Sequence, residues 1–219
     1  MDTLLDLNSK QNFIFDLDGT LIDSMWIWDN LLIDFLAQYG YETPNALLSE
    51  VAYMSLEQSA RRVSELYRLP LSPKEILGAW TDMIYDSYAS KITLKPGVFE
   101  YLNLLKRQGK KIALATANSA ELTAACLKNN GILGCFDVFT YVDEVGAGKS
   151  SPKVYLECLR RMNADPADTV LFEDILEALN TAKSIPLDVV IVEDLSAEND
   201  KPALMKKADL YIRSFCELL

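Results

Sequence analysis

Residues 13–18, with the sequence Phe-Ile-Phe-Asp-Leu-Asp, form an apolar run that ends in two aspartates one residue apart. Side chains alternate between the faces of a strand, so Asp16 and Asp18 are predicted to point the same way at its carboxyl end. In open α/β sheets, ligands bind at this end of the strands. Two carboxylates sharing a small site repel each other unless a hard cation lies between them or one holds a proton. An ordinary strand-end turn, for which Asp and Gly are common residues, is the alternative reading of this segment.

Only helical patterning is found between residues 24 and 92. Two capping-box starts lie in this block, Ser55 with Gln58 and Ser72 with Glu75, each at the expected spacing. No run of alternating apolar and polar residues indicates a strand there. The block is therefore predicted to be an all-helical insertion.

After residue 96 the pattern changes to strands alternating with helices. Strands are predicted at 111–115, 139–142, 169–172 and 188–192, and helices at 98–107, 120–130, 152–162 and 176–184. This alternation is typical of βαβ units and a parallel sheet. We predict an α/β fold with a doubly wound parallel sheet, formed by residues 1–22 and 93–219, and an inserted all-helical cap domain over residues 23–92.

Charge and composition exclude several function classes. The formal net charge of −11 leaves no basic stripe for a nucleic-acid backbone, so no nucleic-acid partner is expected. No apolar run approaches the roughly 18 residues that span a bilayer, and the acidic start lacks the basic region of a signal peptide. The four cysteines form no C-x-x-C pair, which is typical of free thiols. We expect a cytoplasmic protein with no membrane partner.

The chain contains no histidine, which excludes Ser-His-Asp triads and histidine-ligated zinc. Any reaction must therefore use carboxylates, lysine, hydroxyl groups and backbone amides. Such residues follow the predicted strands, whose carboxyl ends meet at one edge of a parallel sheet. They are Asp16, Asp18, Thr116, Asn118, Lys149, Glu173 and Asp174. Each alone has a plain explanation as a helix cap or a surface lysine, but their gathering at one edge predicts a functional site.

Four motifs in this order resemble those of the haloacid dehalogenase superfamily. They are residues 16–20 (Asp-Leu-Asp-Gly-Thr), residues 115–118 (Ala-Thr-Ala-Asn), Gly148-Lys149 with Pro152, and residues 172–174 (Phe-Glu-Asp). The similarity is to members with a helical cap after the first strand, such as phosphoglycolate-type phosphatases and β-phosphoglucomutase. It implies a Rossmann-like core, Asp16 as the nucleophile and Asp18 as the general acid and base. It also implies that Thr116, Ala117, Asn118 and Lys149 bind phosphate and that Asp16, Asp18, Glu173 and Asp174 hold Mg²⁺.

The residues support phosphoryl transfer on physical grounds. A phosphate dianion beside Asp16, Glu173 and Asp174 would be repelled unless magnesium bridged the carboxylates and a phosphate oxygen. An ester oxygen leaves readily only when protonated, which is a task for Asp18. A dehalogenase needs no such second acid. We therefore predict a magnesium-dependent phosphatase that acts on a small phosphorylated metabolite through an aspartyl-phosphate intermediate on Asp16.

Several alternatives stay open. A β-phosphoglucomutase-like sugar phosphomutase is disfavoured because those members use a histidine in the cap. Ile175 and Ala178 replace the usual small polar residue and glycine, and Ser150 replaces a proline after Lys149, which leaves open a degenerate, non-catalytic phosphate-binding member. Residues 146–150 resemble a nucleotide P-loop but lack its first glycine. A further alternative is a receiver domain that stores phosphate on an aspartate. It is disfavoured because such a domain would need no long helical insertion.

The substrate is not readable from the sequence, and neither are protein partners. Specificity in such a design is expected to reside in the cap. Its candidate contact residues are Trp26, Trp28, Tyr53, Met54, Arg61 and Arg62. The two tryptophans have an alternative as packing residues, and the arginines as members of a solvated face.

Overall fold

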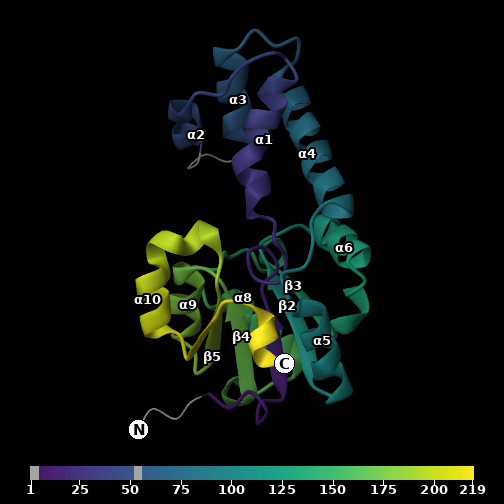
Figure 1. The fold of residues 1–219 in the computed structure, drawn as a ribbon, viewed down its shortest axis with the longest axis vertical. Helices are drawn as coiled ribbons and strands as arrows, with labels where there is room; N and C mark the ends of the chain where they lie inside the picture. The colour runs from purple at the N-terminus through teal and green to yellow at the C-terminus, as the bar shows by residue number, and fades with distance from the viewer. Residues whose placement is uncertain (1–4, 52–55) are drawn as a thin grey trace. The chain divides into compact units, whose positions relative to one another are not determined.

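The computed structural model of the protein describes residues 5–51 and 56–219. These residues divide into two compact units. One is an α/β unit made by the segments up to Asp23 and from Ile92 onward, and the other is a helical unit made by Ser24–Lys91 (Figure 1).

Within the described residues, the α/β unit holds one six-stranded sheet in which every pairing is parallel. The strands are β1 (Asn12–Phe15), β2 (Lys111–Thr116), β3 (Val138–Tyr141), β4 (Thr169–Glu173), β5 (Asp188–Val192) and β6 (Leu210–Ile212). Their order is β3-β2-β1-β4-β5-β6, so the direction of winding reverses at β1. Ligands of doubly wound sheets bind outside the carboxyl ends of the strands at this reversal. The predicted α/β fold with a parallel sheet and a helical insertion after the first strand is confirmed.

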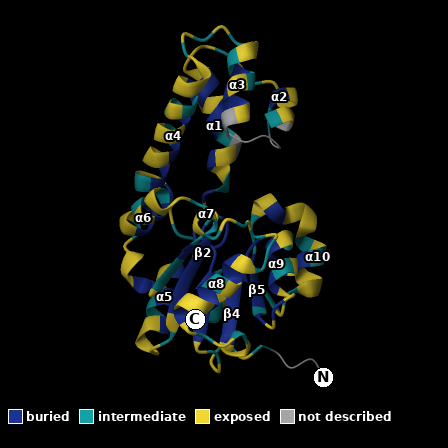
Figure 2. Cartoon of the chain, turned by 180° about the vertical axis from the view of Figure 1, so that it is seen from behind, coloured by how far each residue is buried: buried dark blue, intermediate teal, exposed yellow. Residues whose placement is uncertain are grey.

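Helices connect the strands, as the sequence pattern predicts. They are α5 (Val98–Arg107), α6 (Ala120–Asn129), α7 (Val142–Val145), α8 (Lys153–Met162), α9 (Leu176–Ala182) and α10 (Lys201–Lys207). Short 3-10 helices, η1 (Leu133–Cys135), η2 (Pro166–Asp168), η3 (Leu195–Asp200) and η4 (Phe215–Leu218), complete the unit. The strands are buried between helices whose outer surfaces are exposed (Figure 2).

The two faces of the sheet pack differently because side chains alternate along each strand. Ile14 of β1 belongs to an aliphatic cluster with residues of α8, α9 and α10. On the opposite face, Phe13 and Phe15 contact Phe172 of β4, and the rings of Phe15 and Phe172 stack with centroids 4.6 Å apart. Tyr101 of α5 and Phe215 of η4 complete this aromatic cluster. Two of its members, Phe15 and Phe172, directly precede Asp16 and Glu173 in the sequence.

The aromatic cluster gives a stability prediction. Phe172→Ala removes a fully buried ring that contacts four others, and should lower the free energy of unfolding by about 3–5 kcal/mol. Phe99→Ala on α5 is the control, because half of that side chain is exposed, and it should change stability by less than about 1 kcal/mol. Urea unfolding followed by circular dichroism measures both. A Phe172 variant as stable as the Phe99 variant would contradict this account of the core.

The helical unit contains α1 (Met25–Ala37), α2 (Asn45–Val51), α3 (Leu56–Leu66) and α4 (Pro73–Ser90). The rings of Phe35 in α1 and Trp80 in α4 form a T-shaped pair with centroids 5.6 Å apart. The predicted capping box at Ser72 is confirmed, since its backbone NH donates to Glu75 Oε2 at 2.8 Å and its hydroxyl caps the helix. The other predicted capping residue, Ser55, lies outside the described residues.

The sequence pattern does not predict α2, α7, α10 or β6 as separate elements, nor the four 3-10 helices. Among the residues that the structure describes, no helix combines the length and apolar character needed to cross a membrane. All four cysteines are free thiols.

Candidate active site

Three acidic side chains converge where β1 and β4 end. Asp16 follows β1, and its backbone NH donates to the Phe172 carbonyl at 3.0 Å, which continues the strand pairing. Glu173 is the last residue of β4 and Asp174 follows it. All three are buried, and one carboxylate oxygen from each lies within 4.8 Å of the others. The structure thus brings together three of the predicted site residues at the reversal point of the sheet.

Lys149 reaches this cluster from the loop between α7 and α8. Its Nζ lies 2.5 Å from Asp16 Oδ1 and 2.8 Å from Glu173 Oε1. Burial alone would lower the pKa of Lys149, but the charges of Asp16 and Glu173 outweigh it and raise the pKa above its ordinary value. Lys149 therefore stays an ammonium group in contact with the predicted nucleophile.

Glu173 has a buried partner that sequence reasoning missed. The Tyr155 hydroxyl of α8 donates to Glu173 Oε1 at 3.0 Å, and the Asp174 backbone NH donates to Oε2 at 3.3 Å. Helical periodicity places Tyr155 on the buried face of α8, but gives no sign of this hydrogen bond. Both oxygens of Glu173 are thus already engaged, one of them also by Lys149.

The cluster carries more negative than positive charge. Burial, opposed by Lys149 but reinforced by Glu173 and Asp174, raises the pKa of Asp16 well above its ordinary value. Burial and the charge of Glu173 raise the pKa of Asp174 to about 7. Such shifts arise when carboxylates are poorly neutralised, and a hard divalent cation with oxygen ligands is the usual remedy. The donor set of Asp16 and Asp174 fits such a cation.

The loop after Asp16 contacts Asp174 closely. Gly19 adopts a left-handed conformation with φ +78°, and a Cβ at this position would lie 2.3 Å from Asp174 Oδ2. The Thr20 hydroxyl donates to Asp174 Oδ1 at 3.1 Å. Only glycine allows both the backbone conformation and this approach. The sequence motif gives no role to Thr20, and the structure shows that its hydroxyl bonds to Asp174.

The residues after β2 face Asp18. Thr116 ends β2 and is buried, and its Oγ1 accepts the Asn118 backbone NH at 3.0 Å. Asn118 Nδ2 donates to Asp18 Oδ2 at 2.9 Å, so the predicted phosphate-binding side chain is bonded here to the predicted acid. Ala117 lies between Thr116 and Asn118 in the same loop. Asp18 follows β1 and Thr116 ends β2, and these two strands are neighbours in the sheet.

Ile175 and Ala178, which depart from the family pattern, both pack in the interior of the α/β unit. Ile175 is extended at the start of α9 and packs against the aliphatic cluster beneath the sheet edge. Ala178 is fully buried in the same cluster. Neither side chain offers an oxygen to the acidic site.

The candidate substrate contacts lie in the helical unit. Trp26 and Trp28 of α1 are 37 % and 41 % exposed, so neither is a core packing residue. Arg62 pairs with Glu50 at 2.6 Å, and Arg61 is exposed. Tyr53 and Met54 lie outside the described residues.

Comparisons with known proteins agree with this geometry. Residues 13–192 match the model of a protein family described as haloacid dehalogenase-like hydrolase. The chain is 28 % identical to hexitol phosphatase B of Escherichia coli strain K12, an alignment that covers 94 % of this chain and 92 % of that protein. It is also 28 % identical to a bifunctional riboflavin kinase/FMN phosphatase of Arabidopsis thaliana, but spans only 53 % of that longer protein.

A solved structure shows the same architecture. The crystal structure of CbbY from Rhodobacter sphaeroides in complex with phosphate superposes with a TM-score of 0.75 and 25 % sequence identity. The alignment covers 95 % of this chain and 96 % of that one.

Proposed function

Because the chain belongs to the haloacid dehalogenase-like hydrolase family, we propose that it is a magnesium-dependent phosphatase of small phosphate monoesters, with Asp16 as its nucleophile. One observation carries the proposal: the buried cluster of Asp16, Glu173 and Asp174, in which Lys149 contacts the first two. This arrangement provides a nucleophilic oxygen, an excess of negative charge for a cation, and an ammonium group for a phosphate oxygen.

Asp16 and Asp174 are the residues best placed to hold magnesium. Glu173, also predicted as a ligand, contributes chiefly its charge because its oxygens already accept hydrogen bonds. Asp18 was predicted as a further ligand, but one of its carboxylate oxygens accepts from Asn118. When bound, magnesium would neutralise the carboxylates and withdraw electron density from the phosphate.

In the first step, an Asp16 carboxylate oxygen attacks phosphorus in line and the bond from phosphorus to the ester oxygen breaks. Asp18 gives its proton to the departing oxygen, so that the alcohol leaves neutral. In the second step, Asp18 accepts a proton from water, whose oxygen attacks phosphorus. The bond from phosphorus to Asp16 breaks, and inorganic phosphate is released.

Lys149 and Thr116 serve the transferring group. The Lys149 ammonium now neutralises Asp16 and Glu173, and it can share its hydrogen bonds with a phosphate oxygen beside Asp16. Thr116 Oγ1 accepts the Asn118 backbone NH, which leaves its hydroxyl proton to donate to a second phosphate oxygen. Both groups stabilise charge that spreads over these oxygens in the transition state.

The proposed substrate is a phosphorylated sugar or sugar alcohol. Hexitol phosphatase B matches nearly the whole chain, helical insertion included, and its name describes this class of substrate.

The test is phosphate release from p-nitrophenyl phosphate and a panel of sugar and hexitol phosphates, with and without a chelator. Chelation should lower turnover at least about 100-fold, because the carboxylates then repel the phosphate dianion, and added Mg²⁺ should restore it. Full activity in excess chelator would refute the metal site. A folded protein that releases no phosphate from any ester would favour the non-catalytic alternative, and formation of an isomeric sugar phosphate would favour the mutase.

A further inference from the structure

A buried lysine outside the predicted site holds the loop that carries Asp18. Lys95 Nζ donates to the carbonyl oxygen of Gly19, to the carbonyl oxygen of Glu193 at 2.8 Å, and to Asp194 Oδ2 at 2.7 Å. The side chains of Lys95 and Asp194 are only 10 % and 8 % exposed. The three donors of the ammonium group therefore meet three acceptors, with little access for water.

Each end of this network is fixed independently of the Lys95 ammonium group. The Lys95 backbone NH donates to the Leu21 carbonyl at 2.9 Å, and a bridge pairs Ile22 with Leu94. Asp194 Oδ1 accepts from the backbone NH and the hydroxyl of Ser196 at 2.9 and 2.6 Å, which caps η3. Loss of the ammonium would thus leave both anchors in place and release the Gly19 carbonyl.

Gly19 connects the Lys95 hydrogen bond to the residues of the acidic site. One side of Gly19 approaches the Asp174 carboxylate so closely that no Cβ fits, while its carbonyl is held by Lys95. Asp18 directly precedes Gly19, and Thr20, which follows it, donates to Asp174. Because Gly19 follows Asp18 directly, holding this carbonyl restrains the backbone next to Asp18, whose carboxylate is held separately by Asn118.

From these contacts we infer that Lys95 is a positioning residue for the proposed reaction, which fixes the Asp18–Gly19–Thr20 loop against the acidic site through Asp194. This inference rests on the proposed function. It assigns Lys95 no contact with substrate. Its expected effect is on the placement of Asp18, which matters most for leaving groups that need a proton.

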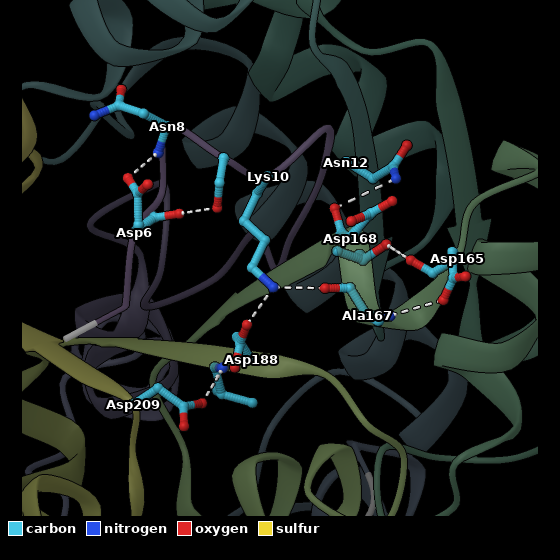
Figure 3. Close-up of polar contacts among 12 residues, drawn as sticks. Asp6, Asn8, Lys10, Asn12, Asp165, Ala167, Asp168, Asp188 and Asp209 are labelled. Atoms are coloured by element: carbon cyan, nitrogen blue, oxygen red, sulfur yellow. Dashed lines mark hydrogen bonds and ion pairs between the residues drawn. The ribbon is translucent and has the colours of Figure 1, made fainter. Parts of the chain in front are cut away.

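The other end of β5 offers a matched control. Lys10 Nζ pairs with Asp188, the first residue of β5, and donates to the Ala167 carbonyl at 2.6 Å (Figure 3). Its side chain is 14 % exposed, close to the value for Lys95. Lys10 thus has the same kind of partners, an aspartate and a backbone carbonyl, at the sheet edge opposite the acidic site.

The experiment compares Lys95→Met, Lys95→Met/Asp194→Asn and Lys10→Met with the unmodified protein. The double variant carries no unpaired buried carboxylate, so it stays testable if the single variant folds poorly. The kcat and KM are measured for p-nitrophenyl phosphate and for an alkyl phosphate, glycerol 3-phosphate. Hydrogen exchange of the Gly19, Leu21 and Ile22 amides is measured without metal or substrate.

Lys95→Met and the double variant should lower kcat on the alkyl phosphate at least about tenfold more than on the aryl phosphate, with KM little changed. The three loop amides should exchange faster in both. Lys10→Met should alter neither the ratio nor the loop exchange. Equal losses on both substrates, or recovery of kcat in the double variant, would overturn the inference, since recovery would mean that Lys95 only balances the charge of Asp194.

The exchange measurement separates this inference from the proposed function. If the unmodified protein releases no phosphate from any ester, the proposed function fails, but the exchange of the loop still reports on Lys95. Unchanged exchange at Gly19, Leu21 and Ile22 in both Lys95 variants would overturn the positioning role whatever the activity.

Discussion

Asp16→Asn should lower phosphate release by about 10⁴-fold or more while the protein stays folded, because an amide cannot form the aspartyl-phosphate. The substitution keeps the shape of the side chain and removes one carboxylate from a buried cluster of acidic groups. Stability should therefore hold or rise, even though Lys149 loses one of its two partners. Steady-state turnover and thermal unfolding of the same preparation measure both effects.

The control for this variant is Asp188→Asn at the opposite edge of the sheet, where Asp188 pairs with Lys10. It removes an aspartate from an ion pair as well, but should leave turnover within about twofold of the unmodified protein. An Asp16→Asn protein that keeps more than a few per cent of the activity would mean that another group attacks phosphorus.

Asp18→Asn should separate the two steps of the reaction. On an alkyl phosphate the variant should lose about 10²–10⁴-fold in turnover, because the departing oxygen receives no proton. On p-nitrophenyl phosphate the first step needs no acid, so one equivalent of nitrophenolate should appear in a rapid burst. The second step then stalls for lack of a base, and the aspartyl-phosphate should accumulate. Rapid-mixing absorbance and intact-protein mass measurements detect the burst and the added phosphoryl group.

A loss of equal size on both esters, without a burst, would reject Asp18 as the acid and base. Asn118→Ala is a useful companion variant, since Asn118 donates to Asp18 Oδ2. If Asn118 orients Asp18, its loss should reduce alkyl phosphate turnover more than aryl phosphate turnover, in the same direction as the Asp18 variant but by a smaller factor.

The elements that the sequence predicts well are those whose signal is local. The strand predicted at 188–192 has those bounds in the structure, because its apolar residues are buried and its ends are marked by polar residues. β6 was missed because it has only three residues, and its strand conformation depends on pairing with β5. α10 was missed as well. Its seven residues include a proline and bury only Leu204 fully, so the sequence carries little helical periodicity there.

The site residues also divide into those with a local sequence signal and those whose role depends on the tertiary fold. Asp16, Glu173 and Asp174 could be predicted to meet because strand ends in a parallel sheet share an edge. Tyr155 and Lys95 could not, since each acts through a side-chain contact with a residue far away in the sequence. A lysine before a proline looks like any surface lysine until the fold buries it. Partners of this kind become visible only when the packing of several elements is known.

The way in which the helical unit joins the α/β unit also has a consequence for the history and engineering of this chain. The Asp23 backbone NH donates to the Thr93 carbonyl at 3.1 Å, and Ile22 pairs antiparallel with Leu94, so the two junctions lie side by side. The segments on either side of the insertion therefore pair like the two arms of a β-hairpin, and the insertion takes the place of the hairpin loop. Recombination at these junctions could exchange one insertion for another without shifting any strand register. Transplanting the equivalent segment of a relative between Asp23 and Ile92 is therefore a practical route to chimeric proteins that keep the sheet of this chain.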